Sequence, residues 1–357
     1  MPRNIREEAA LPLDLKIGLA GIGAYLPPTV VTNEHLTADV DTSDEWIRRR
    51  TGIQERRVLA PGETILDMAL RAARQALDEA GVAPQQLDDI RVGINTWMRF
   101  PSLATQVQRG LGAERASAAD VSAGCAGFVY ALEDAFNRVA TEKLLYGRDA
   151  VALVIGADGL SHVTNWRDRQ TCVLLGDGAG AVVLKRVERG AILAVHTHAD
   201  GRHGDLLYSD APFAPQWRSL RGRRFTHKRS APRPYLHMDG PRVFGLAVRS
   251  MVRDVHAVLD KYAQAGGQRL TPADIEYVFP HQANLRMIEA VAEKLDLPLE
   301  RVYTQGVVRY GNTSTASIPI GYNEMRDRRR GRPGAGYEVD VAVGAGFASG
   351  AVLRRVE

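Results

Sequence analysis

Cysteine is scarce in this chain of 357 residues: Cys125 and Cys172 are the only two, and no CxxC or clustered Cys/His spacing accompanies them. The sequence therefore predicts neither a disulfide framework of the secreted kind nor a zinc site. It also lacks runs of eighteen or more apolar residues and an opening that resembles a signal peptide. We expect a cytoplasmic protein with no structural metal and no membrane span.

Two glycine-rich stretches lack the residues that nucleotide binding needs. Gly21–Gly23 has no third glycine and no following helix, and Gly176–Leu184 is not followed by Gly-Lys-Ser/Thr. We interpret Gly21–Gly23 as turn residues. The glycines of 176–184 are predicted to let a strand approach other backbone closely.

The formal net charge is small, at +4, but two blocks are dense in arginine: 218–233 and 326–332. Such blocks can bind nucleic acid, a membrane surface or an acidic partner. Because no aromatic stacking platform or nucleic-acid module accompanies them, we expect no nucleic-acid partner and no membrane. The remaining alternatives are a solvated basic loop and, as the preferred interpretation, a site for an acidic protein or a phosphate-bearing ligand.

The apolar pattern alternates between strand and helix periods, which predicts an α/β sandwich with mixed sheets. Predicted strands cover 16–24, 90–96, 118–122, 150–157, 171–185, 191–198, 275–280, 338–343 and 350–355, and predicted helices 65–80, 104–111, 125–143, 241–265, 283–294 and 315–326. Residues 1–14 are expected to form a loose arm. The rest divides into two similar halves, 15–186 and 187–357, whose buried helices are shared.

Cys125 lies among small residues at a predicted strand-to-helix junction. A thiolate at a helix N-terminus faces unpaired N–H groups, so the position predicts a nucleophile whose pKa is lowered into a range of roughly 3.5 to 7.5. The alternative is a buried structural cysteine, which is common for a lone free thiol.

Two later junctions carry polar side chains. His281 follows a predicted strand at the opening of a helix, as Cys125 does, and Asn312 lies in a Gly-Asn-Thr-Ser loop ahead of another helix. Each has an ordinary alternative: His281 as a cap or a satisfied core residue, and Asn312 as a turn or N-cap residue.

Several long motifs occur together and in order, and through them the chain resembles the β-ketoacyl-acyl-carrier-protein synthase III family of the thiolase fold. The motifs are DTSDEWIRRRTGIQER (41–56), GCAGF (124–128), DRQT with GDGAGAVVL (168–184), HMDGPRVF (237–244), HQANLR (281–286) and GNTSTASIP (311–319). The resemblance spans nearly the whole chain and implies a layered α/β/α/β/α sandwich.

The resemblance implies a two-stage reaction. Cys125 accepts an acyl group from acyl-coenzyme A, and His281 with Asn312 stabilises the enolate that forms when malonyl-acyl-carrier protein loses CO2. The oxyanion hole would use the backbone N–H groups of Cys125 and Ala345. Acyl-coenzyme A is then a substrate, and no tightly bound cofactor is expected.

Other matching positions imply how the substrates bind and assemble. The implied coenzyme A contacts are Thr42, Trp46, Arg50, Arg169, Gly240, Phe244 and Ala283. Trp46 offers a flat face for adenine, with an arginine to stack opposite it. Arg286 is implied in docking the acidic carrier protein. Phe100 is implied to reach across a homodimer interface and limit the acyl pocket.

Four features depart from the family pattern. Ala345 replaces a glycine, and its methyl group is expected to crowd a tight turn. The other three are Pro241 in place of an asparagine, the bulky segment Thr96–Phe100, and the arginine-rich insertion between Leu207 and Tyr235. They leave an alternative open, a related acyltransferase of natural-product biosynthesis that transfers an acyl group to a hydroxyl or carrier acceptor without decarboxylation. Asn312 favours condensation, because such a transfer has no enolate to stabilise. A non-catalytic carrier-binding protein of the same fold is disfavoured by Cys125.

Overall fold

The computed structural model describes residues 15–209, 235–326 and 336–356. Its main strands are β1 (Ile17–Tyr25), β4 (Asp89–Gly93), β5 (Ser117–Val121), β6 (Ala152–Gly159), β7 (Asp177–Arg186), β8 (Ala191–His198), β11 (Ile275–Pro280), β12 (Gly336–Val343) and β13 (Ser349–Val356), and the short ones are β2 (Thr29–Thr32), β3 (Glu55–Val58), β9 (Leu207–Tyr208) and β10 (His237–Met238). The helices are α1 (Asn33–Leu36), α2 (Asp44–Thr51), α3 (Ile65–Ala80), α4 (Leu103–Leu111), α5 (Gly127–Tyr146), α6 (Gly240–Gln264), α7 (Leu285–Lys294), α8 (Gln305–Tyr310) and α9 (Ser317–Glu324).

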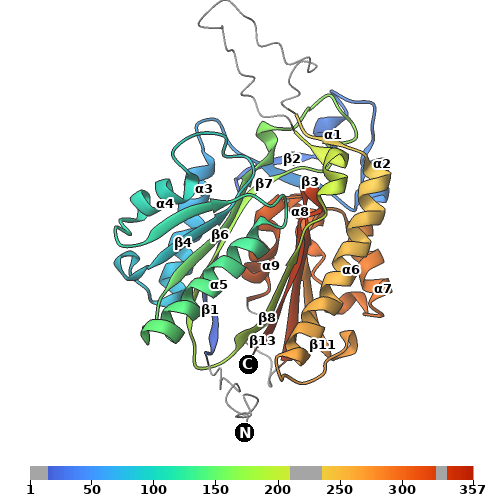
Figure 1. Ribbon diagram of the computed structural model, residues 1–357. Helices are drawn as coiled ribbons and strands as arrows, with labels where there is room; N and C mark the ends of the chain where they lie inside the picture. Colours follow the sequence, from blue (N-terminus) through green and yellow to red (C-terminus); the bar gives the residue numbers. More distant parts are fainter. Residues whose placement is uncertain (1–14, 210–234, 327–335, 357) are drawn as a thin grey trace, which may run out of the picture.

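Two mixed sheets organise the described chain. One has the strand order β1-β7-β6-β4-β5 and the other β11-β12-β13-β8. Helices α5 and α9 lie between the sheets, α3 and α4 cover the outer face of the first, and α6 and α7 cover the outer face of the second (Figure 1). The predicted α/β/α/β/α sandwich is therefore confirmed.

The contact between α3 and β1 shows how the sequence positions these layers. Helix α3 begins after Thr64, whose side chain accepts a hydrogen bond from the N–H of Asp67, and ends at Gly81 with φ 60°. Its buried face is rich in alanine, and a Cβ added at Gly21 would lie 2.2 Å from the Ala76 carbonyl oxygen. The interpretation of Gly21–Gly23 as turn residues is therefore wrong: they are strand residues that let the helix backbone approach the sheet.

The glycines of β7 serve the inner face of the same sheet. A Cβ added at Gly180 would lie 2.7 Å from the side chain of Pro319 in α9. The close approach predicted for the glycines of 176–184 is therefore present. The predicted bounds of the strand were wrong, because it begins at Asp177 rather than at residue 171. Residues before it form a turn in which the Asp168 carbonyl accepts hydrogen bonds from the N–H groups of Thr171 and Cys172.

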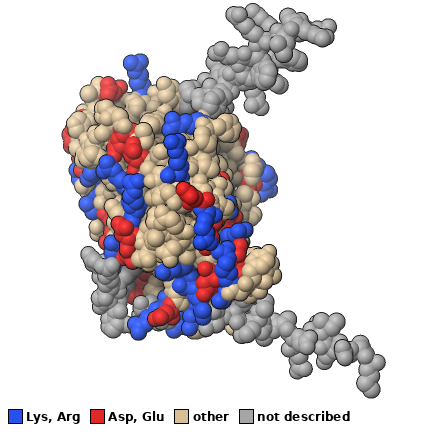
Figure 2. All heavy atoms as spheres, turned by 90° about the vertical axis from the view of Figure 1, so that its left-hand side faces the viewer, with Lys and Arg blue, Asp and Glu red and all other residues tan. Residues whose placement is uncertain are grey.

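The arm 1–14 and the arginine-rich block 218–233 lie outside the described residues, and of the block 326–332 only Arg326 lies inside them. None of the described helices is long and apolar enough to cross a membrane. Positive and negative side chains are interspersed over the face seen in Figure 2, which is the left-hand side of Figure 1 and carries α3 and α4.

Candidate active site

Cys125 lies two residues before α5, between the two sheets. Its sulfur accepts a hydrogen bond from the Ser314 hydroxyl, with Oγ and Sγ 3.4 Å apart, and the Asn312 side chain lies near enough to lower the pKa of the thiol. Cys125 as a whole residue is partly exposed, whereas Cys172 is buried. The structure thus brings together two of the three predicted catalytic residues, Cys125 and Asn312, which lie far apart in the sequence.

The pKa of the Cys125 thiol differs from the sequence-based expectation. Burial raises it to about 11, and the hydrogen bond from Ser314 only partly offsets that effect. The predicted lowering was wrong because Gly127 begins the helix, so the sulfur is not directly on its first turn, and because the desolvation of a thiolate outweighs the helix dipole. Cys125 is therefore a protonated thiol in the resting protein at neutral pH.

The loop of Cys125 packs backbone to backbone against the loop after β12. Gly124 has φ 55°, and a Cβ there would lie 2.3 Å from the Ala345 nitrogen. A Cβ at Gly344 would lie 2.2 Å from the Cys125 nitrogen. Two glycines are required for this close approach, which brings the two predicted oxyanion-hole N–H groups to neighbouring positions.

Ala345 itself is tolerated. The residues of this turn with left-handed backbone angles are Gly346 (φ 72°) and Phe347 (φ 48°), not Ala345. The methyl group that distinguishes this chain therefore imposes no left-handed strain on the backbone.

Asn312 is fixed by its own backbone and by the turn that follows it. Its N–H donates to the Leu174 carbonyl, its carbonyl accepts from the Gly176 N–H, and its Oδ1 accepts from the Ser314 N–H at 2.8 Å. The preceding Gly311 has φ 68° and ψ −160°, a conformation that essentially only glycine adopts. With Oδ1 committed, the amide nitrogen is the group available to the sulfur.

His281 follows β11, and its N–H donates to the Val341 carbonyl of β12. The imidazole is buried, and Nδ1 lies 2.8 Å from the hydroxyl oxygen of Ser317. Burial lowers the pKa of His281 to about 4, so the ring is neutral at pH 7. The prediction that His281 opens a helix was wrong: Asn284 caps α7, which begins at Leu285. His281 reaches the segment of Asn312 through Ser317.

Three of the residues implied in coenzyme A binding lie together at α2. The guanidinium carbon of Arg169 is 3.9 Å from the Trp46 ring centroid and that of Arg50 is 5.9 Å from it. Arg169 therefore occupies an indole face that was expected to receive adenine. Just before α2, the Thr42 hydroxyl is buried and has no hydrogen-bond partner among the described residues, and the same holds for Arg169 Nε.

The remaining implied binding residues lie around the second sheet. Trp46, Phe244 and Ala283 are partly buried and pack against one hydrophobic cluster that contains Val243 and Ile288. Gly240 begins α6, and its missing side chain leaves space there. Pro241 follows in the first turn, where the absence of an N–H costs nothing. Arg286 is exposed in the first turn of α7.

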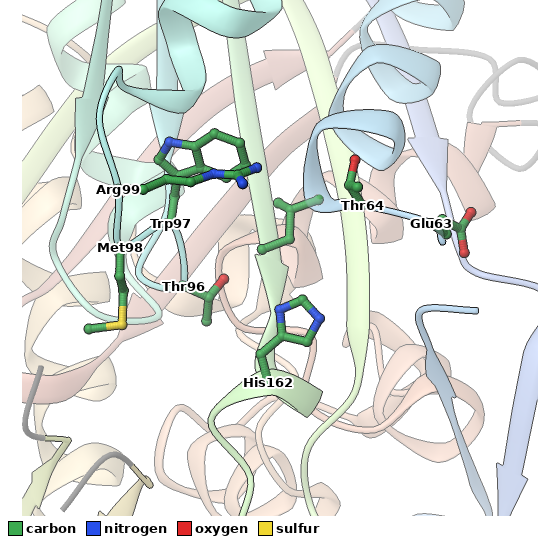
Figure 3. Close-up of a pocket in the computed structure, with 8 residues that line it drawn as sticks. Glu63, Thr64, Thr96, Trp97, Met98, Arg99 and His162 are labelled. Atoms are coloured by element: carbon green, nitrogen blue, oxygen red, sulfur yellow. The ribbon is translucent and has the colours of Figure 1, made fainter. Parts of the chain in front are cut away.

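Phe100 is fully exposed on the single chain. Beside it, a cavity of about 280 Å³ is lined by Glu63, Thr64, Ile65, Thr96, Trp97, Met98, Arg99 and His162. Figure 3 shows Arg99 lying against the Trp97 indole, with a guanidinium carbon to ring centroid distance of 3.9 Å. Neither Phe100 nor Cys125 lines this cavity, so the single chain does not place Phe100 in an acyl pocket of its own.

Sequence reasoning missed the groups that hold the site together: Ser314, Ser317, Asn95 and Asp158. Their signals were present, since GNTSTAS is dense in hydroxyls and ALVIGADG places an acid at the end of an apolar strand. The described residues contain no group of three or more His, Cys, Asp or Glu side chains arranged to hold a metal ion.

Comparison with known proteins points to one family. The sequence model of 3-oxoacyl-[acyl-carrier-protein] synthase III matches residues 119–201, and that of its C-terminal part matches residues 267–356. The β-ketoacyl-[acyl-carrier-protein] synthase III of Alkalilimnicola ehrlichii is 45% identical over 340 residues, which are 94% of this chain and 98% of that protein. The same enzyme of Rhodobacter capsulatus is 42% identical over 96% of this chain and all of its own length.

Solved structures give the same result. The 3-oxoacyl-[acyl-carrier-protein] synthase III of Aquifex aeolicus superposes with a TM-score of 0.80 at 42% identity, covering 95% of this chain and 99% of that one. The priming β-ketosynthase of the R1128 polyketide pathway superposes with a TM-score of 0.80 at 32% identity, covering 95% and 96%. From its motifs, its layers and these full-length matches, the chain belongs to the β-ketoacyl-acyl-carrier-protein synthase III family of thiolase-fold condensing enzymes.

Proposed function

We propose that this protein loads an acyl group from acyl-coenzyme A onto Cys125 and condenses it with malonyl-acyl-carrier protein, releasing CO2 and giving a β-ketoacyl thioester. The relatives are named for this activity, and one structural neighbour primes polyketide synthesis. The observation that carries the proposal is the meeting of the Cys125 sulfur with the Asn312–Ser317 segment: Ser314 donates a hydrogen bond to the sulfur, and the buried, neutral His281 contacts Ser317.

Acyl loading needs a nucleophile and a place for negative charge. The Cys125 sulfur attacks the thioester carbonyl, the coenzyme A sulfur leaves, and the thiol proton ends on coenzyme A. Because the resting thiol is protonated, the proton has to leave as the new bond forms. The paired loops at Gly124 and Gly344 support an oxyanion hole made by the N–H groups of Cys125 and Ala345, where one donor is typically worth about 10² to 10³ in rate.

Decarboxylation then needs two donors that do not titrate. Loss of CO2 from the malonyl thioester leaves an enolate, whose oxygen would accept hydrogen bonds from His281 Nε2 and the Asn312 amide. A neutral imidazole suits this role when the Ser317 hydroxyl donates to Nδ1, because the ring proton then sits on Nε2. The enolate carbon attacks the acyl-cysteine carbonyl, and the Cys125 sulfur leaves and regains a proton.

Substrate binding and assembly complete the proposal. Thr42, Trp46, Arg50, Arg169, Gly240, Phe244 and Ala283 would bind coenzyme A, and Arg286 would dock the carrier protein. The exposed Phe100 supports a homodimer in which a second copy covers it. We also propose that the halves 15–186 and 187–357 each supply part of the site.

Intact-protein mass spectrometry tests acyl loading. Incubation with a panel of short, branched and aromatic acyl-coenzyme A donors should add the mass of one acyl group, and Cys125→Ala should abolish the addition. No shift with any donor would contradict the proposal.

The second stage is tested by adding malonyl-acyl-carrier protein to the acylated enzyme. Release of CO2 together with a β-ketoacyl product is expected. Transfer of the acyl group to a hydroxyl acceptor without CO2 release would instead identify the alternative acyltransferase.

A further inference from the structure

Asp158 is a fully buried acid near the end of β6 that the proposed chemistry does not use. Its Oδ1 accepts hydrogen bonds from the N–H of Asn95 at 2.9 Å and from the N–H and hydroxyl of Thr96 at 3.1 and 2.9 Å. Its Oδ2 accepts from the Asn95 amide at 3.2 Å and from the hydroxyl and N–H of Thr315 at 3.0 and 3.4 Å. Every partner is a donor, as an ionised carboxylate requires.

These contacts connect the two sides of the site. The Asn95 amide that reaches Asp158 also donates to the Gly124 carbonyl at 3.0 Å and lies 3.4 Å from the Ser314 hydroxyl oxygen. Ser314 in turn donates to the Cys125 sulfur. One carboxylate therefore fixes both the loop that carries the nucleophile and the segment that follows Asn312.

Ser314 shows that this segment needs restraint. It has φ 53°, an uncommon conformation for a residue with a side chain, and conformations of this kind persist only where surrounding contacts hold them. Contacts on both sides of Ser314 provide this restraint. The Ser314 N–H donates to Asn312 Oδ1, and the N–H and hydroxyl of the next residue, Thr315, donate to Asp158.

The charge of Asp158 also acts on the thiol. Asp158 contributes to the raised pKa of Cys125, after the larger effect of burial. Ser314, which donates to the sulfur, and Asn312 are neutral, and burial keeps His281 neutral at pH 7. The residue that holds this segment in place, Asp158, therefore also brings a negative charge that disfavours the Cys125 thiolate.

We propose that Asp158 is a positioning residue of the condensation site, which holds the Asn95–Thr96 turn and the Ser314–Thr315 segment so that Cys125 and Asn312 meet. The effect on turnover rests on the proposed function, whereas the effect on the thiol does not. A purely structural acid would stabilise the fold without affecting Cys125.

The neighbouring strand offers a matched control. Asp177 of β7 is as buried as Asp158, and it accepts hydrogen bonds from the Leu59 N–H and from the N–H and hydroxyl of Ser161. None of these partners contacts the Cys125 loop in the described structure. Asp177→Asn should therefore lower the free energy of unfolding without changing the reactivity of Cys125.

The experiment compares Asp158→Asn with Asp177→Asn, both in a Cys172→Ser background, by the rate of Cys125 alkylation with iodoacetamide against pH. Asp158→Asn should move the curve to lower pH, because the nearby negative charge is gone, so that the rate at pH 8 rises severalfold. In turnover with acyl-coenzyme A and malonyl-carrier protein, its kcat should fall by about 10- to 100-fold, with little change in the KM for acyl-coenzyme A. A kcat that falls no further than that of Asp177→Asn would overturn the positioning role, and an alkylation curve that matches that of Asp177→Asn would overturn the effect of the Asp158 charge on the thiol.

Two further variants keep the test decisive if Asp158→Asn does not fold. Asn95→Ala retains the charge but cuts the link to Gly124, so it should lower kcat without moving the alkylation curve to lower pH. Thr315→Ser keeps the hydroxyl and should restore most of the kcat lost in Thr315→Val. Wild-type kcat in Asn95→Ala and in Thr315→Val would refute the positioning role. If the wild-type protein loads no acyl group, the proposed function fails while the alkylation comparison still tests Asp158.

Discussion

Replacing Gly124 with alanine should separate the two loops that form the predicted oxyanion hole. An alanine at φ 55° costs roughly 1 to 2 kcal/mol in backbone conformation alone. Its Cβ would lie 2.3 Å from the Ala345 nitrogen, and since ordinary contact begins at 3.4 Å, the loops have to part by about 1 Å. A displacement of that size at a reacting group can cost about 10²-fold in rate. We expect kcat to fall by about 10² to 10³.

Gly147 provides the control, because it has φ 65° at the C-terminal end of α5 and open space where a Cβ would be. Gly147→Ala should pay the same conformational cost and keep its activity. Urea denaturation gives the free energy of unfolding of each variant, and steady-state turnover gives kcat. If both variants lost equal stability and both remained active, the argument from the close approach would be refuted.

Three other predictions concern the ionisation and binding residues. Because burial lowers the pKa of His281 to about 4, the rate of CO2 release from malonyl-carrier protein should show no inflection with pH between about pH 5 and 8. A change in this rate centred near pH 6.5 would be inconsistent with a neutral His281 donor. Arg169→Ala should raise the KM for acyl-coenzyme A about 5- to 30-fold, because it removes the cation next to Trp46. The control Arg167→Ala, at an exposed position, should leave this KM near the wild-type value. Equal KM values for the two variants in initial-rate assays would exclude Arg169 from coenzyme A binding. Arg286→Glu should raise the KM for the carrier protein and flatten its dependence on salt, and an unchanged salt dependence would move the docking surface elsewhere.

Regular elements with clear end signals were predictable from the sequence. Helix α3 was predicted at its observed bounds from its helical apolar pattern, and the structure shows why they are sharp: Thr64 and Asp67 form a capping box and Gly81 ends the helix. The strand at 171–185 was predicted too long, since side-chain pattern does not reveal that the Asp168 carbonyl closes a turn around Thr171 and Cys172. Gly21–Gly23 was misread because the partner that needs those glycines, α3, lies about fifty residues away in sequence.

The identities of the reactive residues were easier to predict than their properties. Motifs named Cys125, His281 and Asn312, but the pKa of the thiol depends on how much solvent it loses, which only the packed structure defines. Asp158 escaped notice for the same reason: its partners Asn95 and Thr315 are brought to it by tertiary contacts.

The reciprocal packing of Gly124 and Gly344 has a consequence for how the protein is made. Translation delivers the thiol roughly two hundred residues before the backbone that packs against it. A nascent chain that ends before Gly344 therefore carries Cys125 without the loop that supplies the second N–H of the predicted oxyanion hole, so the proposed acyl loading has to wait until β12 and the loop after it are made.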